Sequence, residues 1–168
     1  MRIPALLALA LSLSLPATAA DDLAQDRDTV IALLAASVAA RALVSTAVDE
    51  CTARYADMVD PALDAKMEWE VRNQPVEAKA RDIANRLGSK IAASSGFLAY
   101  ETQKKHLLAE SETQTAANVR QTMTKTFASS TEPQRVAACK DLVKSVHDGK
   151  MDFAITQPNA FKILQTFR

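Results

Sequence analysis

The sequence predicts an all-α fold, an irregular helical bundle of four to six helices with one disulfide. Hydrophobic residues make up 48% of the 168 residues, which is enough to bury a core. Alanine is the commonest residue, and the strong helix formers Gln, Glu, Lys, Arg and Leu fill much of the remainder. No run of alternating β-branched and polar residues, which would predict a strand, follows residue 21.

A cleaved secretory signal peptide is predicted over residues 1–20, which leaves a single helical domain over residues 21–168. Arg2 supplies a positive n-region, and residues 3–15 form an apolar h-region that is too short to span a bilayer. Pro16 ends this region, and small residues then offer a cleavage site. The leader predicts export to the bacterial periplasm, with full secretion as the alternative.

The first helix is expected from Asp21 or Asp22 to about Met58. Its residues 30–48 have the length of a membrane span, but they are rich in alanine and include Arg41. A central arginine costs about 2.5–3.5 kcal/mol in a membrane helix. We therefore predict no membrane span in the mature chain, and a central bundle helix in which Arg41 has an acidic partner or a route to water. As an alternative, its alanine-rich surface forms a homo-oligomer interface.

A second helix is expected over about 61–73, because Asp60-Pro61 combines a capping residue with proline at the first helical position. Leu63, Met67 and Trp69 are expected to face inward.

Pro75 either restarts a helix or kinks a longer one. Beyond it, apolar residues three or four positions apart predict a third helical stripe: Val76, Ala80, Ile83, Leu87 and Ile91. Gly88 interrupts this stripe, and residues 94–96, Ser-Ser-Gly, are the better break.

A fourth helix is expected over about 97–127, although its middle, residues 110–117, is polar on every face and is therefore either exposed or not helical. Residues 129–133, Ser-Ser-Thr-Glu-Pro, are typical of a helix start. The fifth helix then ends near Gly149, where a C′ glycine is expected. A short closing helix follows from Asp152 or Pro158.

Two cysteines in an exported chain predict one disulfide, Cys51–Cys139. Both cysteines lie on the apolar stripes of expected helices. The bridge closes a loop of roughly 89 residues. By restricting the unfolded chain, a loop of this length is expected to stabilise the fold by about 4.6 kcal/mol. The alternatives are an intermolecular bridge and a redox-active thiol pair, although no CxxC motif is present to lower a thiolate pKa.

Composition excludes several functional classes. Three glycines are too few for a phosphate-binding loop or a dinucleotide fingerprint, and two cysteines with two histidines exclude zinc fingers, iron–sulfur clusters and HExxH metalloproteases. Lys+Arg and Asp+Glu both number 20, so the chain lacks the basic surface of a nucleic-acid-binding protein. We predict no cofactor and no metal site.

The most distinctive local segment is Trp69-Glu70-Val71-Arg72-Asn73. The lone tryptophan is a candidate anchor for a partner, with Arg72 and Asn73 as polar contacts at the rim. The alternative is a half-buried tryptophan that packs a helix pair. We therefore predict an exported helical binding or scaffold protein whose partner is an unidentified protein or another component of the cell envelope.

Two alternatives from other functional classes remain open. The first is a small hydrolase of envelope glycans that uses a buried glutamate as general acid, with Glu68, Glu70 and Glu101 beside aromatic residues as candidates.

The second alternative is a carrier of non-covalent haem or metal. In this case His106 or His147 would act with Met58 or Met67 as axial ligands. If neither histidine binds a ligand, His106 lies on a solvated face and His147 interacts with a helix C-terminus.

Overall fold

The computed structural model describes residues 19–93 and 97–167, with side chains from Ala24 onward. This part of the chain contains six α-helices and one short 3₁₀ helix, and no strand. The all-α prediction is therefore confirmed. The signal peptide and the expected break at residues 94–96 fall largely or wholly outside the described residues.

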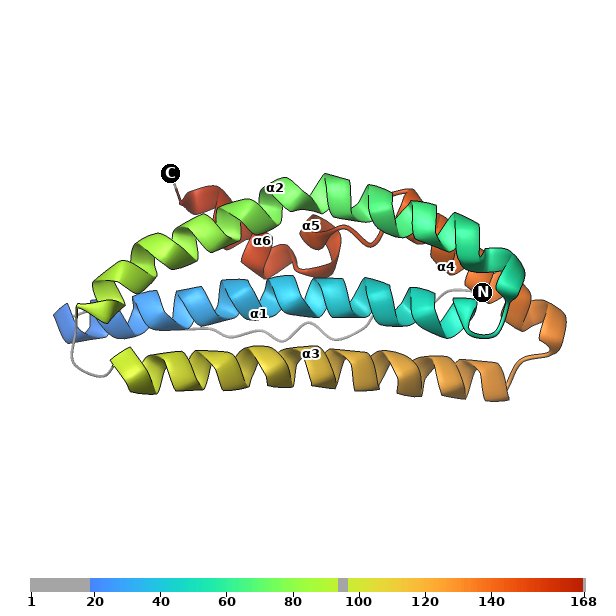
Figure 1. Cartoon of the computed structure of the whole chain (residues 1–168), viewed down its shortest axis with the longest axis horizontal. Coiled ribbons are helices and arrows are strands. Elements are labelled where there is room, and N and C mark those ends of the chain that lie inside the picture. The colour runs from blue at the N-terminus through green and yellow to red at the C-terminus, as the bar shows by residue number, and fades with distance from the viewer. Residues whose placement is uncertain (1–18, 94–96, 168) are drawn as a thin grey trace.

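Three long helices form the frame of the bundle: α1 (Ala19–Thr52), α2 (Val59–Ala92) and α3 (Phe97–Ala128). α1 lies between α2 and α3, as predicted for the most apolar helix (Figure 1). By length and composition, Ala24–Thr52 is the one described helix that could cross a membrane. Here it packs as a core helix, and Arg41 forms an ion pair with Glu77 of α2.

α1 ends earlier than predicted. The backbone leaves the helix after Thr52, Tyr55 adopts an extended conformation, and the 3₁₀ helix η1 (Ala56–Met58) turns the chain into α2. Because Cys51 and Met58 are both buried, the apolar spacing continues across the turn and hides it in the sequence.

α2 begins at Val59, and it is one helix that passes through Pro75 and Gly88 without a break. The alternative that Pro75 restarts a helix is therefore wrong. Proline removes one helical hydrogen bond and bends the helix, and α2 is visibly arched in Figure 1. The expectation that Leu63 and Met67 face inward is also wrong, since both side chains are exposed. The buried face of this half of α2 is instead formed by smaller neighbours and by one large side chain: Ala62, Ala65, Trp69 and Asn73.

α3 contacts mainly α1 and has only two buried side chains among its described residues, Tyr100 and Phe127. Its polar middle is helical and largely exposed, which decides between the two sequence-based alternatives. One polar contact in this middle is structural, because the Ser111 hydroxyl donates to the Ala35 carbonyl of α1 at 3.1 Å.

The remaining helices are α4 (Glu132–His147), α5 (Phe153–Thr156) and α6 (Pro158–Thr166). Thr131 caps α4 in a capping box whose second member is Gln134. Gly149 has φ +77°, the left-handed conformation expected of a C′ glycine.

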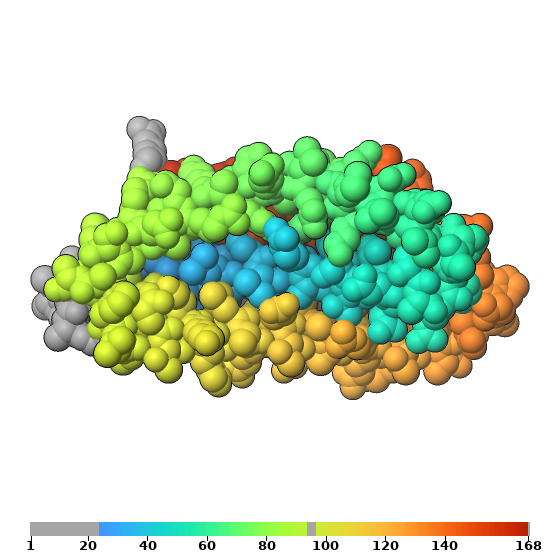
Figure 2. Space-filling model, viewed as in Figure 1, coloured from blue at the N-terminus to red at the C-terminus, as the bar shows by residue number. Residues whose placement is uncertain are grey.

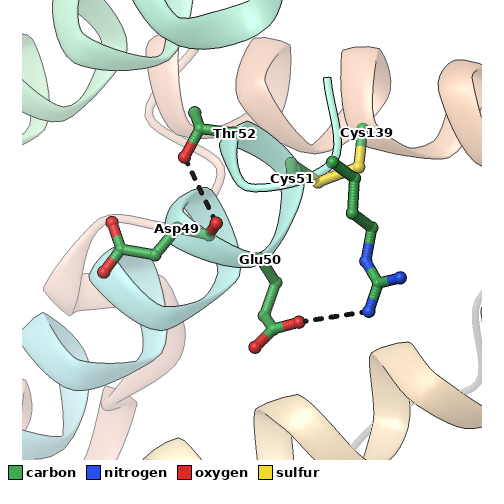
Figure 3. The surroundings of a disulfide bond; sticks show 6 residues. Asp49, Glu50, Cys51, Thr52 and Cys139 are labelled. Carbon is green, nitrogen blue, oxygen red and sulfur yellow. Dashed lines mark hydrogen bonds and ion pairs between the residues drawn. A yellow bond between two sulfur atoms is a disulfide. The ribbon is translucent and has the colours of Figure 1, made fainter. Parts of the chain in front are cut away.

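Cys51 of α1 and Cys139 of α4 are joined, with an S–S distance of 2.00 Å and a Cα–Cα distance of 5.6 Å (Figure 3). The disulfide lies in a small second core with Met58 and Phe127. It therefore ties the end of the central helix to the middle of α4.

Candidate functional site

Trp69, the predicted anchor, is a core residue that is 1% exposed. Its Nε1 donates to the Met151 carbonyl at 2.8 Å, which fixes the segment between α4 and α5 against α2. The tryptophan is thus buried and hydrogen-bonded within the chain, which agrees with the alternative that it packs helices together.

Arg72 and Asn73 hold the same segment. Arg72 Nε lies 3.1 Å from Asp152 Oδ2, and Arg72 Nη2 donates to the Val146 carbonyl at 2.6 Å. Asn73 Nδ2 donates to Asp152 Oδ1 at 3.1 Å, and Asn73 Oδ1 accepts from the Phe153 amide at 2.8 Å. These bonds join residues about 80 positions apart, and no local pattern of the sequence contains them.

We call Trp69, Arg72 and Asn73 together with Asp152 the C-terminal staple. Its polar atoms are engaged by the chain itself, so a partner that used Trp69 as an anchor would first have to displace the segment around Phe153. Binding of a partner by Trp69, Arg72 and Asn73 stays a prediction.

The outer face of α2 carries four apolar side chains at intervals of four residues: Val59, Leu63, Met67 and Val71. They are 45%, 55%, 54% and 70% exposed. Residues spaced in this way form one ridge along a helix, so the four side chains make a continuous apolar strip, which we call the α2 stripe. Scattered apolar residues on a surface need no explanation, but an ordered row of four does.

Charged residues flank the α2 stripe on both sides. Asp60, Asp64 and Glu68 each follow a stripe residue directly, so they form a parallel acidic row. Lys66 and Glu70 flank the other side. Arg72 follows Val71 and ends the first row, and its Nη1 lies 3.6 Å from Glu68 Oε2. The rim therefore carries four acids and two cations, and its net charge is negative on the side of Asp60 and Asp64.

The beginning of the stripe adjoins a shallow cleft of about 300 Å³ between α2 and α4. Met58, Pro61 and Val143 give it an apolar floor, and Lys140, Lys144 and His147 lie on the α4 side. These cations are partly compensated by acids. Hydrogen bonds from Lys144 and then from His147 lower the pKa of Asp148 from 3.8 to about 2; burial opposes this shift, and Lys150 adds a smaller lowering effect.

The three candidate acids of the hydrolase alternative lie at the surface or half-buried. Glu68 Oε2 is 3.4 Å from His147 Nε2, and Glu101 Oε1 is 2.5 Å from Lys104 Nζ. The buried acid among the described residues is a different one, Glu77, and it bonds to Arg41. A glutamate in an apolar pocket, which this mechanism needs, is therefore not provided by Glu68, Glu70 or Glu101.

The two histidines are far from forming a ligand cluster. His106 is exposed and lies 3.6 Å from Glu110, and His147 is exposed beside Asp148. Met58 is buried next to the disulfide, whereas Met67 belongs to the exposed stripe. In the described residues no three His, Cys, Asp or Glu side chains are grouped so that they could hold a metal ion.

Sequence reasoning missed the α2 stripe because it assigned the largest apolar residues to the core. The signal was present: Ala62, Ala65 and Trp69 already complete one buried row, which leaves Leu63 and Met67 in a second apolar row. No protein-family model matches the chain, and no curated protein or solved structure is significantly similar to it.

Proposed function

We propose that this protein is an exported helical binding protein of the periplasm, and that the α2 stripe binds one helix of a partner protein. The single observation that carries the proposal is the ordered row of exposed apolar side chains on α2. The row spans residues 59–71, or about 18 Å at 1.5 Å per residue, which matches roughly three turns of a partner helix. Residues at intervals of four form the ridges that interdigitate in the commonest class of helix packing.

The acidic rim defines the chemistry of the partner. Asp60, Asp64 and Glu68 favour a helix with lysine or arginine on the side of its apolar face that meets this row, since complementary charge directs association and suppresses wrong partners. Two copies of this chain would bring two acidic rims together across the same apolar row. The charge of the rim therefore favours a basic partner over a homodimer built on the α2 stripe.

Export is supported by the disulfide, because structural disulfides persist in oxidising compartments, and by the apolar leader of the sequence. The periplasm is the compartment that we propose for the mature protein.

Two synthetic helical peptides with the same leucine face test this function, one with lysine flanks and one with glutamate flanks. Fluorescence anisotropy measures their binding to the mature protein. We expect the lysine peptide to bind at least about tenfold more tightly than the glutamate peptide, a difference of about 1.4 kcal/mol. The preference should decrease at high salt because charges at an exposed rim are screened.

Leu63→Asp and Met67→Asp should each abolish binding of the lysine peptide, because they place a charge in the apolar row. The matched control is Leu98→Asp, since Leu98 is an even more exposed apolar side chain that lies on α3 instead. Equal binding of both peptides, or equal loss in the Leu98 variant, would contradict the proposal. Dimerisation of the wild-type protein that Leu63→Asp disrupts would assign the stripe to a second copy of this chain.

A further inference from the structure

A second recess lies at the other end of the frame, between α2 and the start of α3. On the face shown in Figure 2, α1 is set back between α2 and α3. A cleft of about 470 Å³ is lined by residues of these three helices. Its volume is within the range of about 300–1,000 Å³ that is typical of small-molecule sites.

Part of the lining of this cleft is apolar, and Asn85 and Ser89 of α2 add polar side chains to it. Val30 and Leu34 of α1 contribute to its lining, as do Phe97 and Tyr100 of α3, which are separated by one helical turn. Val30 and Tyr100 are buried in the core, so packing fixes their positions, whereas Leu34 and Phe97 are the more accessible apolar side chains of the lining. Burial also raises the pKa of the Tyr100 phenol, with a smaller contribution from Glu101, so the ring lines the cleft in its neutral form.

Gly88 keeps the α2 wall open. A Cβ atom built at this position meets no other atom within 4 Å, although Gly88 lines the cleft. Glycine in a helix interior costs about 1 kcal/mol relative to alanine. A large side chain at residue 88 would therefore have room to extend and would occupy the space that glycine leaves free.

The polar part of the lining has a net positive charge. Arg81 of α2 and Lys104 of α3 stand on different walls. Lys104 Nζ forms an ion pair with Glu101 Oε1 at 2.5 Å and lies 5.1 Å from the centroid of the Tyr100 ring. Arg81 Nη1 is only loosely paired, 3.8 Å from Glu77, since Glu77 accepts its short bond from Arg41. The first turn of α3 also lines the cleft, and the N-terminal end of a helix carries a partial positive charge.

We infer that this cleft binds a single-chain amphiphile with one anionic head group, which places its alkyl chain against Leu34 and Phe97 and its head group at Arg81, with Lys104 on the opposite wall. The inference does not depend on the α2 stripe, because the two surfaces share no residue. A free fatty acid and a lysophospholipid-like phosphate have the same essential chemistry, an alkyl chain with one anionic end.

Isothermal titration calorimetry of the mature protein tests this site with decanoate, decyl phosphate and decyltrimethylammonium, each below its micelle concentration. We expect both anions to bind and the cation to bind at least about tenfold more weakly. The tighter of the two anions identifies the head group as carboxylate or phosphate. Equal binding of the decyltrimethylammonium cation would overturn the inference, as would absence of binding by both anions.

Variants at residue 88 locate the ligand. Gly88→Leu should reduce decanoate affinity at least about tenfold because the leucine side chain fills the cleft. Gly88→Ala should keep the affinity within about twofold and raise the melting temperature, because alanine favours the helix and meets no neighbour. Circular dichroism establishes that both variants are folded.

Arg81→Gln should weaken decanoate binding, whereas Lys79→Gln, which removes an exposed cation of α2 outside the cleft, should not. Decanoate affinity that is unchanged in Gly88→Leu, or reduced equally by Arg81→Gln and Lys79→Gln, would show that the amphiphile binds elsewhere and would overturn the inference.

Discussion

Replacing Asn73 by alanine should destabilise the protein by detaching the C-terminal segment from α2. Asn73 is 2% exposed and makes three hydrogen bonds: to the Trp69 carbonyl at 2.7 Å, to Asp152 at 3.1 Å and from the Phe153 amide at 2.8 Å. Asp152 keeps Arg72 as a partner in the variant. The buried Phe153 amide, in contrast, loses the acceptor that the Asn73 side chain supplies.

The unpaired amide dominates the expected cost. A buried donor without an acceptor costs about 1–3 kcal/mol, and the loss of a bond to the charged Asp152 adds about 1 kcal/mol. We therefore expect the free energy of unfolding to fall by about 2–4 kcal/mol. For a domain of this size each kcal/mol lowers the melting temperature by about 2–4 °C, so the midpoint should fall by roughly 4–16 °C.

Urea denaturation followed by tryptophan fluorescence measures this loss, because Trp69 is the single tryptophan and is bonded to the segment in question. The matched control is Asn85→Ala, an exposed asparagine on the same helix, which should change stability by less than about 0.5 kcal/mol. Amide hydrogen exchange should show that Phe153 loses protection in the Asn73 variant. A stability equal to that of the Asn85 variant, with Phe153 still protected, would refute the assigned role of Asn73.

Three further perturbations test other parts of the structure. Reducing the disulfide should lower the free energy of unfolding by about 2–5 kcal/mol, measured by urea denaturation with and without dithiothreitol; an unchanged midpoint would contradict its structural role. Lys144 chiefly lowers the pKa of Asp148, so the ionised Asp148 contributes to the stability of the fold. This contribution is present above pH 3.8 and is lost as the pH falls toward about 2. The Asp148→Asn variant should therefore lose less stability over this interval than the wild type in acid titrations followed by circular dichroism. Arg41→Ala should cost more stability than Glu77→Gln in thermal melts, because the Glu77 side chain is 9% exposed and would remain as a poorly paired charge, whereas that of Arg41 is 53% exposed and reaches water. The reverse order would contradict this assignment of burial.

Local chemistry predicted those parts of the fold that depend on neighbouring residues. The capping residue Thr131 and the C′ glycine Gly149 define α4 as expected, because helix ends are set by a few adjacent side chains. The pairing of Cys51 with Cys139 followed from the count of two cysteines and the expectation that the chain is exported. The acidic partner expected for Arg41 exists, although its identity, Glu77, required coordinates.

Features that depend on contacts between distant segments could not be predicted from neighbouring residues. Pro75 normally breaks a helix, but α2 continues through it because packing on α1 and α4 supports both halves of the helix. Tertiary packing also decides which apolar row is buried, since the row that includes Trp69 contacts the C-terminal segment. The cleft beside Gly88 depends on the approach of three helices, so no periodicity in one of them predicts it.

The C-terminal staple bears directly on the proposed function of α2. The inner face of this helix is already closed by Met151 and Phe153, which are held by Trp69 and Asn73. A small rotation of α2 that buried Leu63 and its neighbours against the described residues would break the staple. Within the described part of the chain, exposure of the α2 stripe is consequently a property of the fold, and this apolar surface is available to another molecule.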